Sequence, residues 1–321
     1  MTCGGPRTAG PAGGYGAAMR IGVSLSSTHD VDDHAEGARF MIERARLAHE
    51  VGLDHLGVGD HHSSRVPYYQ NTPMLGRLLA EWPERAAGAL FLLPLWHPVL
   101  MAEQIGTLAA IHDGPFIIQT GLGGRPGEFA AMGRSLRRRV GDFEETVRVV
   151  DALLAGHTVS SERFGIVDAA IAPRPPGPVE WWFGAGVDPG LERAARFGGV
   201  WYASPGLGFE QGREMAARFR EHHQQHRGAG ESEARLIIRQ DALIAPTRDW
   251  AWALADPILS SGYRGMTADH VAVGTPQEVA ERFSHWREAG FTDVSVRQMS
   301  VGQPDALRSL ELLGEVRELL Q

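Results

Sequence analysis

The segment ALFLLPLWHPVLMAEQIGTLAAIHDGPFIIQT, residues 89–120, contains the pattern that decides the fold. It opens with an apolar run, Ala89 to Leu93, which predicts a buried strand. Pro98 then marks the start of a helix, because the first helical position needs no backbone N–H donor. A second apolar run, Phe116 to Thr120, predicts the next strand. A strand, a helix and a second strand in this order are typical of a β/α unit with parallel strands.

The same alternation of short apolar runs and helix-period segments continues on both sides of this unit. Strands are predicted at residues 21–25, 53–59, 89–93, 116–120, 181–184, 200–203, 236–244 and 294–296, with a hairpin at residues 157–172. Asp188-Pro189 is interpreted as an N-cap followed by Pro, and Thr275-Pro-Gln-Glu278 as a capping box. Eight such units in about 300 residues predict an α/β fold, a (β/α)8 TIM barrel with loop insertions. An open doubly wound sheet would usually stop at about five or six strands.

The chain is predicted to form one barrel domain at residues 19–321, preceded by a disordered tail at residues 1–18. The tail consists mainly of Gly, Ala and Pro and lacks the apolar stretch of a signal peptide. Met19 leads directly into a strand, so either Met1 or Met19 is the physiological start. The single cysteine, Cys3, excludes an internal disulfide and a zinc cage, and it favours a reducing, cytoplasmic location.

The composition narrows the class of ligand. All 31 basic residues are Arg, because the sequence contains no Lys. This excludes a P-loop lysine and a Schiff-base lysine, and it leaves Arg and backbone N–H groups to hold any phosphate. A net charge of -8 argues against a nucleic-acid partner, and no run of 18 apolar residues predicts a membrane span. A small molecule is therefore the expected ligand.

In a (β/α)8 barrel the reactive groups lie at the carboxyl ends of the strands. The strand predicted at residues 53–59 is followed by Asp60-His61-His62. His61 is interpreted as a proton donor or acceptor near neutral pH, and the alternative is a polar strand end in which Asp60 satisfies a histidine. Adjacent histidines also suit a metal. Because the first strand ends in serines rather than in a His-x-His motif, no metal is expected.

Two further features suit a phosphate group. Glycine-rich turns follow two of the predicted strands, at residues 121–125 and 184–187. They allow backbone N–H groups to approach a phosphate, although each turn alone is usually only a tight strand-to-helix connection. Arg137-Arg138-Arg139 is interpreted either as a solvated face or, in a chain without Lys, as a phosphate clamp.

The quoted segment is also the centre of an ordered set of motifs. Its first part, from Ala89 to Gln104, is preceded by Gly59-Asp-His-His and is followed by Gly121-Leu-Gly-Gly. Further motifs are Glu50-Val-Gly-Leu-Asp-His, Phe143-Glu-Glu-Thr-Val and Val273-Gly-Thr-Pro-Gln-Glu-Val-Ala-Glu-Arg-Phe. The set resembles the bacterial-luciferase-like, flavin-dependent oxidoreductases from about residue 20 to about residue 320. The resemblance is specific for the family but not for a substrate.

This resemblance implies a barrel that binds a reduced flavin at the carboxyl ends of its strands. It places the active-site histidine at His61, and it places a non-prolyl cis peptide at Ala89–Leu90, behind the flavin ring. The cofactor contacts that it implies are Ala89, Leu90, Thr120, Gly121, Leu122, Arg137, Arg139, Ala185, Gly186 and Val187. A homo-oligomer is a further implication.

The function predicted from the resemblance is a monooxygenase that uses reduced FMN and O2 on a small organic substrate, with His61 handling the protons. A separate reductase is expected to supply the flavin, because no Rossmann fingerprint is visible. One alternative keeps the fold and uses the deazaflavin F420 for hydride transfer. Against it, Ser63, Ser64 and Arg125 stand near the positions where the sugar-phosphate dehydrogenase branch tends to have Trp and Glu. The other alternative is a flavin-binding protein without catalytic activity.

Overall fold

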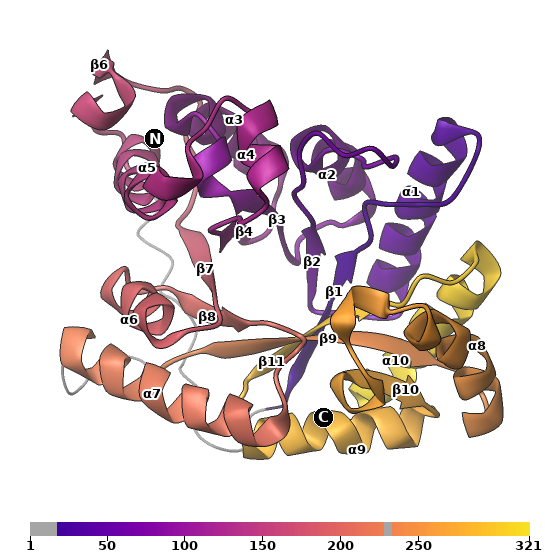
Figure 1. Cartoon of the computed structure of the whole chain (residues 1–321). Helices are drawn as coiled ribbons and strands as arrows, with labels where there is room; N and C mark the ends of the chain where they lie inside the picture. Colours follow the sequence, from indigo (N-terminus) through magenta and orange to yellow (C-terminus); the bar gives the residue numbers. More distant parts are fainter. Residues whose placement is uncertain (1–17, 228–232) are drawn as a thin grey trace, which may run out of the picture.

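A closed ring of parallel strands surrounded by helices forms the centre of the molecule (Figure 1). The structure is a computed structural model that describes residues 18–227 and 233–321. The predicted tail at residues 1–18 therefore lies almost entirely outside the described residues. Within the described ranges, no helix is both long enough and apolar enough to cross a lipid bilayer.

Eight strands form the ring in the order β9-β11-β1-β2-β3-β4-β7-β8, and pairing of β8 with β9 closes it. These strands are β1 (Arg20–Leu25), β2 (His55–Val58), β3 (Ala86–Leu92), β4 (Phe116–Gly121), β7 (Val179–Ala185), β8 (Val200–Ala203), β9 (Leu236–Ile244) and β11 (Asp293–Gln298). A ninth strand, β10 (Val271–Gly274), pairs with the last residues of β9 and lies outside the ring. The predicted hairpin consists of β5 (Val159–Ser161) and β6 (Ile166–Ala169). The predicted (β/α)8 barrel is thus confirmed.

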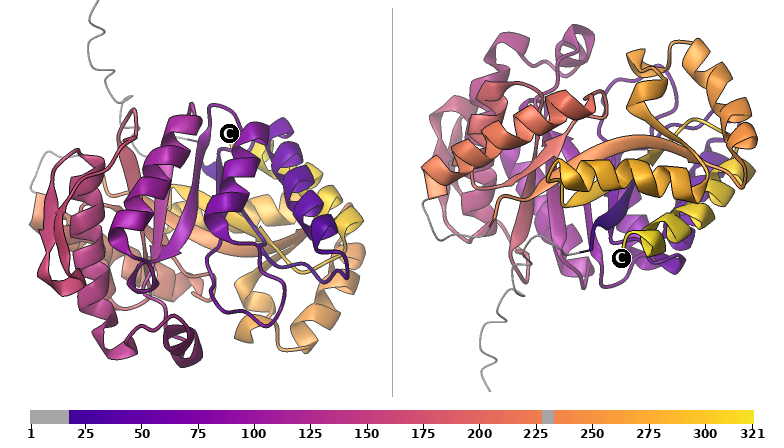
Figure 2. Two further views of the ribbon diagram at one scale, coloured as in Figure 1. Left: turned by 90° about the horizontal axis from the view of Figure 1, so that it is seen from above. Right: turned by 90° about the horizontal axis from the view of Figure 1, so that it is seen from below.

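Helices connect the strands and cover the outside of the barrel (Figure 2). They are α1 (His34–Glu50), α2 (Asn71–Leu78), α3 (Pro98–Ile111), α4 (Pro126–Ala131), α5 (Arg139–Leu154), α6 (Asp188–Arg196), α7 (Phe209–Arg227), α8 (Arg248–Ser260), α9 (Pro276–Glu288) and α10 (Gln303–Leu319). Two 3-10 turns, η5 (Tyr263–Gly265) and η6 (Ala268–His270), follow α8. The capping box predicted at the start of α9 is present, since Thr275 and Glu278 each accept the other's backbone N–H.

Alternate residues of each strand face two different cores. Ile238 of β9 belongs to the large core between the strands and the helices, whereas Ile237 belongs to a smaller core with Ile117 and Trp182. Because side chains alternate along a strand, Arg239 and Asp241 share the inward direction of Ile237. Strands of a parallel barrel are usually continuous apolar runs, so two charged residues at inward positions of β9 are unusual.

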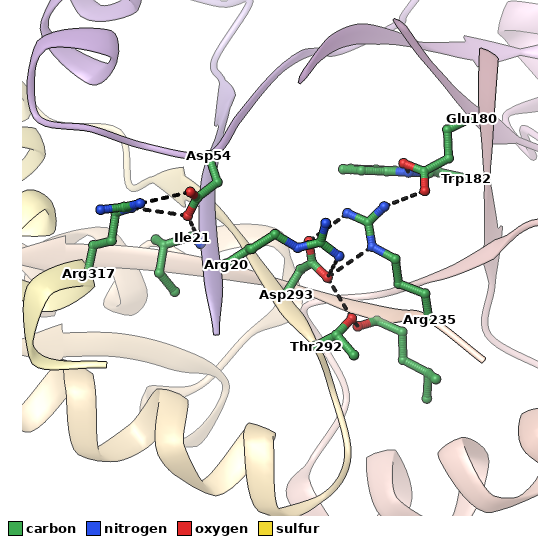
Figure 3. A network of polar contacts seen from close by, with 10 residues as sticks. Arg20, Ile21, Asp54, Glu180, Trp182, Arg235, Thr292, Asp293 and Arg317 are labelled. Atoms are coloured by element: carbon green, nitrogen blue, oxygen red, sulfur yellow. Dashed lines mark hydrogen bonds and ion pairs between the residues drawn. The ribbon is translucent and has the colours of Figure 1, made fainter. Parts of the chain in front are cut away.

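A network of charged residues fills the amino-terminal end of the barrel (Figure 3). The buried carboxylate of Asp293, at the start of β11, lies 3.0 Å from Nε of Arg20 and 2.7 Å from Nη2 of Arg235. Arg235 also pairs with Glu180 of β7. Burial raises the pKa of Asp293, but the charges of Arg235 and Arg20 outweigh it and hold the pKa below its ordinary value. This end of the barrel is therefore closed by ion pairs, far from the end where barrel enzymes react.

His55 lies above this network and is enclosed by its neighbours. Its ring fills the space that a Cβ on Gly22 would take, at 2.2 Å, and packs edge-on against Trp182 with ring centroids 5.0 Å apart. Burial lowers the pKa of His55 to about 4, so the imidazole is neutral at physiological pH. A neutral, packed histidine at this depth belongs to the core.

Two local predictions are wrong. The Ala89–Leu90 peptide is trans, and the cis bond found within the described residues is Ala172–Pro173. A trans bond before a residue other than proline is more stable by about 3 to 4 kcal/mol, and β3 pairs with both neighbours in regular register through this bond. Asp188 is not the N-cap of α6: Val187 holds that position, and no side chain caps this helix start. Asp188 is instead the first helical residue, where its charge still suits the helix dipole.

Candidate active site

His61 forms a pair with a buried carboxylate at the carboxyl end of β2. Its Nδ1 lies 2.7 Å from Oε1 of Glu128, which also accepts a hydrogen bond from the backbone N–H of His62 at 2.8 Å. The side chain of Glu128 is 4% exposed and that of His61 is 23% exposed. The carboxylate is therefore fixed, and it orients a ring whose other nitrogen, Nε2, remains for a ligand at the barrel mouth.

Asp60 fastens the end of β2 to the end of β3. Its Oδ2 accepts hydrogen bonds from the backbone N–H of Leu92 at 2.7 Å and from the indole N–H of Trp96 at 2.8 Å. Its Oδ1 lies 3.3 Å from Nε2 of His62. Burial lowers the pKa of His62, but the nearby carboxylate of Asp60, with a smaller effect of Glu128, raises it overall. Asp60 and His62 thus hold the loop, and His61 is the more accessible imidazole.

Tyr68 covers His61 from the loop that follows β2. The two rings meet edge to face with centroids 5.4 Å apart. The hydroxyl of Tyr68 lies so close to Gly59 that a Cβ there would be 2.5 Å from it, so a larger residue at position 59 would displace the end of the Tyr68 side chain. Burial raises the pKa of Tyr68, and its hydroxyl stays protonated near neutral pH. His61 is therefore bounded by a carboxylate on one side and by a phenol on the other.

The two cofactor residues predicted on β3 face different sides of the strand. Ala89 is buried in the large core between the strands and the helices. Leu90 is half-buried, and its carbonyl accepts a hydrogen bond from the side chain of Asn71 at 2.7 Å. Leu90 is therefore the residue of this pair whose side chain faces the barrel interior.

The residues predicted on β4 divide in the same way. Thr120 is buried, and its hydroxyl donates a hydrogen bond to the carbonyl of Trp182 at 3.2 Å. Gly121 and Leu122 are half-buried at the end of the strand. A ligand at this point would meet the backbone of residues 121 and 122 rather than the hydroxyl of Thr120.

The predicted phosphate residues on β7 and α6 lie at an exposed turn. Ala185 is half-buried, and Gly186 and Val187 are exposed directly before the uncapped start of α6. Nε of Arg193 and Nη2 of Arg196 in α6 lie 2.8 and 2.9 Å from Oε1 of Glu144 in α5. These ion pairs hold the two helices side by side, so the turns that precede both helices lie at the same end of the barrel.

The arginines predicted to clamp a phosphate lie just before and at the start of α5. Arg137 is exposed, whereas Arg139 is half-buried and donates to the carbonyl of Leu136 at 2.9 Å. Nε of Arg139 is buried without a hydrogen-bond partner among the described residues. Arg138 turns instead toward Asp142, 3.7 Å away. In the described part of the chain, no contact joins these arginines to Gly186 or Val187.

Sequence reasoning does not single out Glu128, and its partner His61 is 67 positions away in the sequence. A usable signal is its place in α4, directly after the glycine-rich turn that follows β4. Arg239 and Asp241 are also missed, although two charges at alternating positions in the apolar run of residues 236–244 indicate inward-facing polar groups. Within residues 18–227 and 233–321, no three His, Cys, Asp or Glu residues are grouped to hold a metal.

Comparison with known proteins gives a family and its relatives. The luciferase-like monooxygenase family matches residues 19–293. A curated relative, the F420-dependent glucose-6-phosphate dehydrogenase of Kribbella flavida, is 28% identical over 203 residues, or 60% of this chain and 59% of the relative. The chain thus matches less than two thirds of the length of that relative.

Solved structures with the same fold include enzymes with different reactions. The monooxygenase RslO1 from Streptomyces bottropensis has a TM-score of 0.81 at 20% identity, with 92% of this chain and 98% of that chain covered. The oxygenating constituent of 3,6-diketocamphane monooxygenase from Pseudomonas putida, solved with FMN, has a TM-score of 0.74 at 17% identity, with 95% and 99% covered. At these identities the likeness shows the fold alone. The family match extends over most of the barrel, and the chain therefore belongs to the luciferase-like monooxygenase family, whose members are oxidoreductases.

Proposed function

We propose that this chain is a monooxygenase that uses reduced FMN and O2 to oxygenate a small organic substrate, with a separate reductase supplying the flavin. The observation that carries the proposal is the pair of His61 and the buried Glu128 at the barrel mouth. In such a pair the carboxylate orients the imidazole and fixes which ring nitrogen faces the barrel mouth. His61 is thereby equipped to accept a proton at Nε2 and to return it.

The protein's own residues surround this histidine closely. Bound FMN would supply the electrons with which O2 is activated. Tyr68 packs edge-on against His61 at 5.4 Å, and Trp96 packs in the same way against His62 at 5.5 Å. Both rings exclude water from the side of the loop, which strengthens the electrostatic interaction between His61 and Glu128.

The turns before α5 and α6 fit the terminal phosphate of FMN. A helix start without a side-chain cap presents free N–H groups to an anion, and α6 has such a start. The buried, unpartnered Nε of Arg139 is a second donor, which a phosphate oxygen would satisfy. The ion pairs between α5 and α6 keep both groups at one end of the barrel.

A second function, F420-dependent hydride transfer, is favoured by two observations. The curated relatives from Kribbella flavida and Amycolatopsis mediterranei, each 28% identical, are F420-dependent glucose-6-phosphate dehydrogenases. Glu128 also supplies a carboxylate shortly after the glycine-rich turn. The sugar-phosphate dehydrogenase branch tends to have Glu near this turn, where Arg125 stands in this sequence. In that reaction His61 would accept the hydroxyl proton of an alcohol while the hydride leaves its carbon.

The two functions differ in cofactor and in their use of oxygen. We expect reduced FMN to bind at least about tenfold more tightly than reduced F420, a difference of about 1.4 kcal/mol, and oxygen uptake to depend on an added organic substrate. Equilibrium titration under anaerobic conditions and an oxygen electrode measure the two quantities. Tighter binding of F420 without oxygen uptake would support hydride transfer instead. Flavin binding without turnover of any compound in a broad panel would indicate a carrier protein.

Replacing Arg137 or Arg139 with alanine tests the phosphate site. Loss of a charged hydrogen bond of about 1.5 to 3 kcal/mol is expected to weaken FMN binding by roughly ten- to a hundredfold. Riboflavin lacks the phosphate, so its affinity should change little. Arg138→Ala is the matched control, because Arg138 faces Asp142 instead. Equal losses for FMN and riboflavin, or none for either, would show that these arginines form a solvated face.

A further inference from the structure

A second group of arginines lies inside the barrel mouth, apart from the phosphate site proposed above. Arg239 of β9 pairs with Asp241, since its Nη2 lies 2.9 Å from Oδ1 of a carboxylate that is 0% exposed. Tyr263 and Arg264 reach the same carboxylate from η5: the phenol donates a hydrogen bond to Oδ2 at 2.9 Å, and Nε of Arg264 lies 3.8 Å away. Asp241 is thus already shared by several donors.

Arg297 of β11 is the third arginine of this group. Its Nη2 lies 3.3 Å from the hydroxyl of Ser26, and within the described ranges no carboxylate oxygen lies within 4.0 Å of its guanidinium. Burial lowers the pKa of Arg264, and the charges of Arg239 and Arg297 lower it further. Arg239 and Arg264 therefore share one carboxylate, and Arg297 adds a third positive charge that repels theirs.

This excess of positive charge favours the binding of an anion, which the described residues do not provide. Charged side chains that are removed from water are normally paired, and the side chain of Arg239 is 14% exposed, whereas that of Arg264 is 41% exposed and in contact with solvent. Asp241 neutralises one of the three arginines. An anion that entered the mouth would neutralise the others, and guanidinium groups bind phosphate and carboxylate in two-pronged geometry.

Tyr68 lies between the arginine cluster and His61. Tyr68, whose ring contacts His61, is close enough to Arg297 and Arg264 for their charges to lower its pKa, against the larger effect of burial that raises it. In the ring, only β1 separates β11, which carries Arg297, from β2, which carries His61, and only β8 separates β9 from β7. Figure 1 shows α8 and α5, next to the two arginine groups, on opposite sides of the barrel.

We propose that Arg239, Arg264 and Arg297 form a subsite for an anionic group of the substrate, a phosphate or a carboxylate. The subsite holds the substrate by its charged end with the reacting carbon toward His61. That the anion belongs to a substrate rests on the proposed function, whereas the binding of an anion at this cluster does not. Such a subsite would make this chain specific for small anionic compounds.

Calorimetry with inorganic phosphate and with malonate, as probes of the two anionic groups, tests the subsite directly. We expect the wild-type protein to bind at least one of them, and Arg297→Gln and Arg264→Gln each to weaken that binding by about ten- to a hundredfold. The preferred probe identifies the anionic group. Arg46→Gln is the matched control, since Arg46 lies on the outer surface of α1, pairs with Glu81 and leaves that carboxylate its second partner, Arg77. Arg239→Gln is avoided because it would leave the buried Asp241 with less compensation.

The other outcomes separate this proposal from the proposed function. Unchanged binding in Arg297→Gln and Arg264→Gln, or no binding of either probe to the wild-type protein, overturns the subsite. Weaker binding of FMN but not of riboflavin in Arg297→Gln also overturns it, because the cluster would then hold the cofactor phosphate. Loss of anion binding in the variants of a protein that binds no FMN would keep the subsite and refute the proposed cofactor.

Discussion

Substituting alanine for His61 is expected to lower turnover by about 10²-fold or more, the usual scale for the loss of an acid–base group. Flavin affinity should remain nearly intact, because His61 is held by Glu128 and Tyr68 at the end of β2. The phosphate site proposed for the flavin lies beyond β3 and β4 in the ring. The measurement is the rate of substrate-dependent oxidation of reduced FMN, with flavin affinity determined on the same preparation.

Two further variants separate a role in proton transfer from a role in structure. Glu128→Gln keeps the shape of the side chain but removes the charge that supports His61, so it should lower turnover by a smaller factor. In the double variant the two losses should not add, since Glu128 acts through His61. His157→Ala is the control, because that histidine is exposed before the hairpin. An unchanged rate constant in His61→Ala with bound substrate would remove His61 from the mechanism.

The second large effect concerns stability. Replacing Asp293 with asparagine is expected to lower the free energy of unfolding by about 3 to 5 kcal/mol, because it removes one partner of a buried ion pair. The carboxylate is 0% exposed and neutralises Arg20 and Arg235 at the closed end of the barrel. Urea unfolding followed by tryptophan fluorescence gives the free energy. The flavin affinity of the folded variant should not change.

The pH dependence gives an independent check of the same pair. The pKa of Asp293 is below its ordinary value of 3.8, so its contribution to stability is complete above about pH 4 and is lost as the pH falls through the lower folded value. The difference between the wild-type protein and Asp293→Asn should therefore shrink below about pH 4. Arg39→Gln is the control, since both side chains of the Arg39–Asp33 pair are exposed and such a pair contributes about 0 to 1 kcal/mol. A difference of that small size for Asp293→Asn would contradict the assigned role.

The fold was predictable because each strand of the barrel is a local apolar run. All eight predicted strands lie at strands of the ring, and the largest shift is at β3, which begins at Ala86 rather than at Ala89. The missed strand, β10, has four residues between η6 and the capping box of α9, and it lies outside the ring of eight β/α units that the sequence pattern describes. It pairs with β9 from Asp241 to Ile244, and pairing between distant strands leaves no local trace.

The site was less predictable because it depends on pairs of residues far apart in the sequence. The sequence and the family resemblance indicate His61, but a carboxylate 67 positions away completes the pair. The arginine cluster likewise joins residues of β9, β11 and η5. The predicted cis peptide failed for the opposite reason: a feature carried over from relatives was not required by the regular pairing of β3 in this chain.

Because β10 lies outside the ring, the segment between β9 and β10 is structurally separate from the eight strands of the barrel. Residues 246–270, which contain α8 and η5, connect β9 to β10. At the base of this connection the N–H of Ala245 donates to the carbonyl of Gly274 at 3.1 Å. The ring itself is closed by β8, β9 and β11, so the length and sequence of this segment can change without breaking a barrel hydrogen bond. Yet the segment contributes Tyr263 and Arg264 to the mouth. We therefore expect that exchanging this one segment alters substrate preference at the proposed site while His61 and Glu128 stay unchanged.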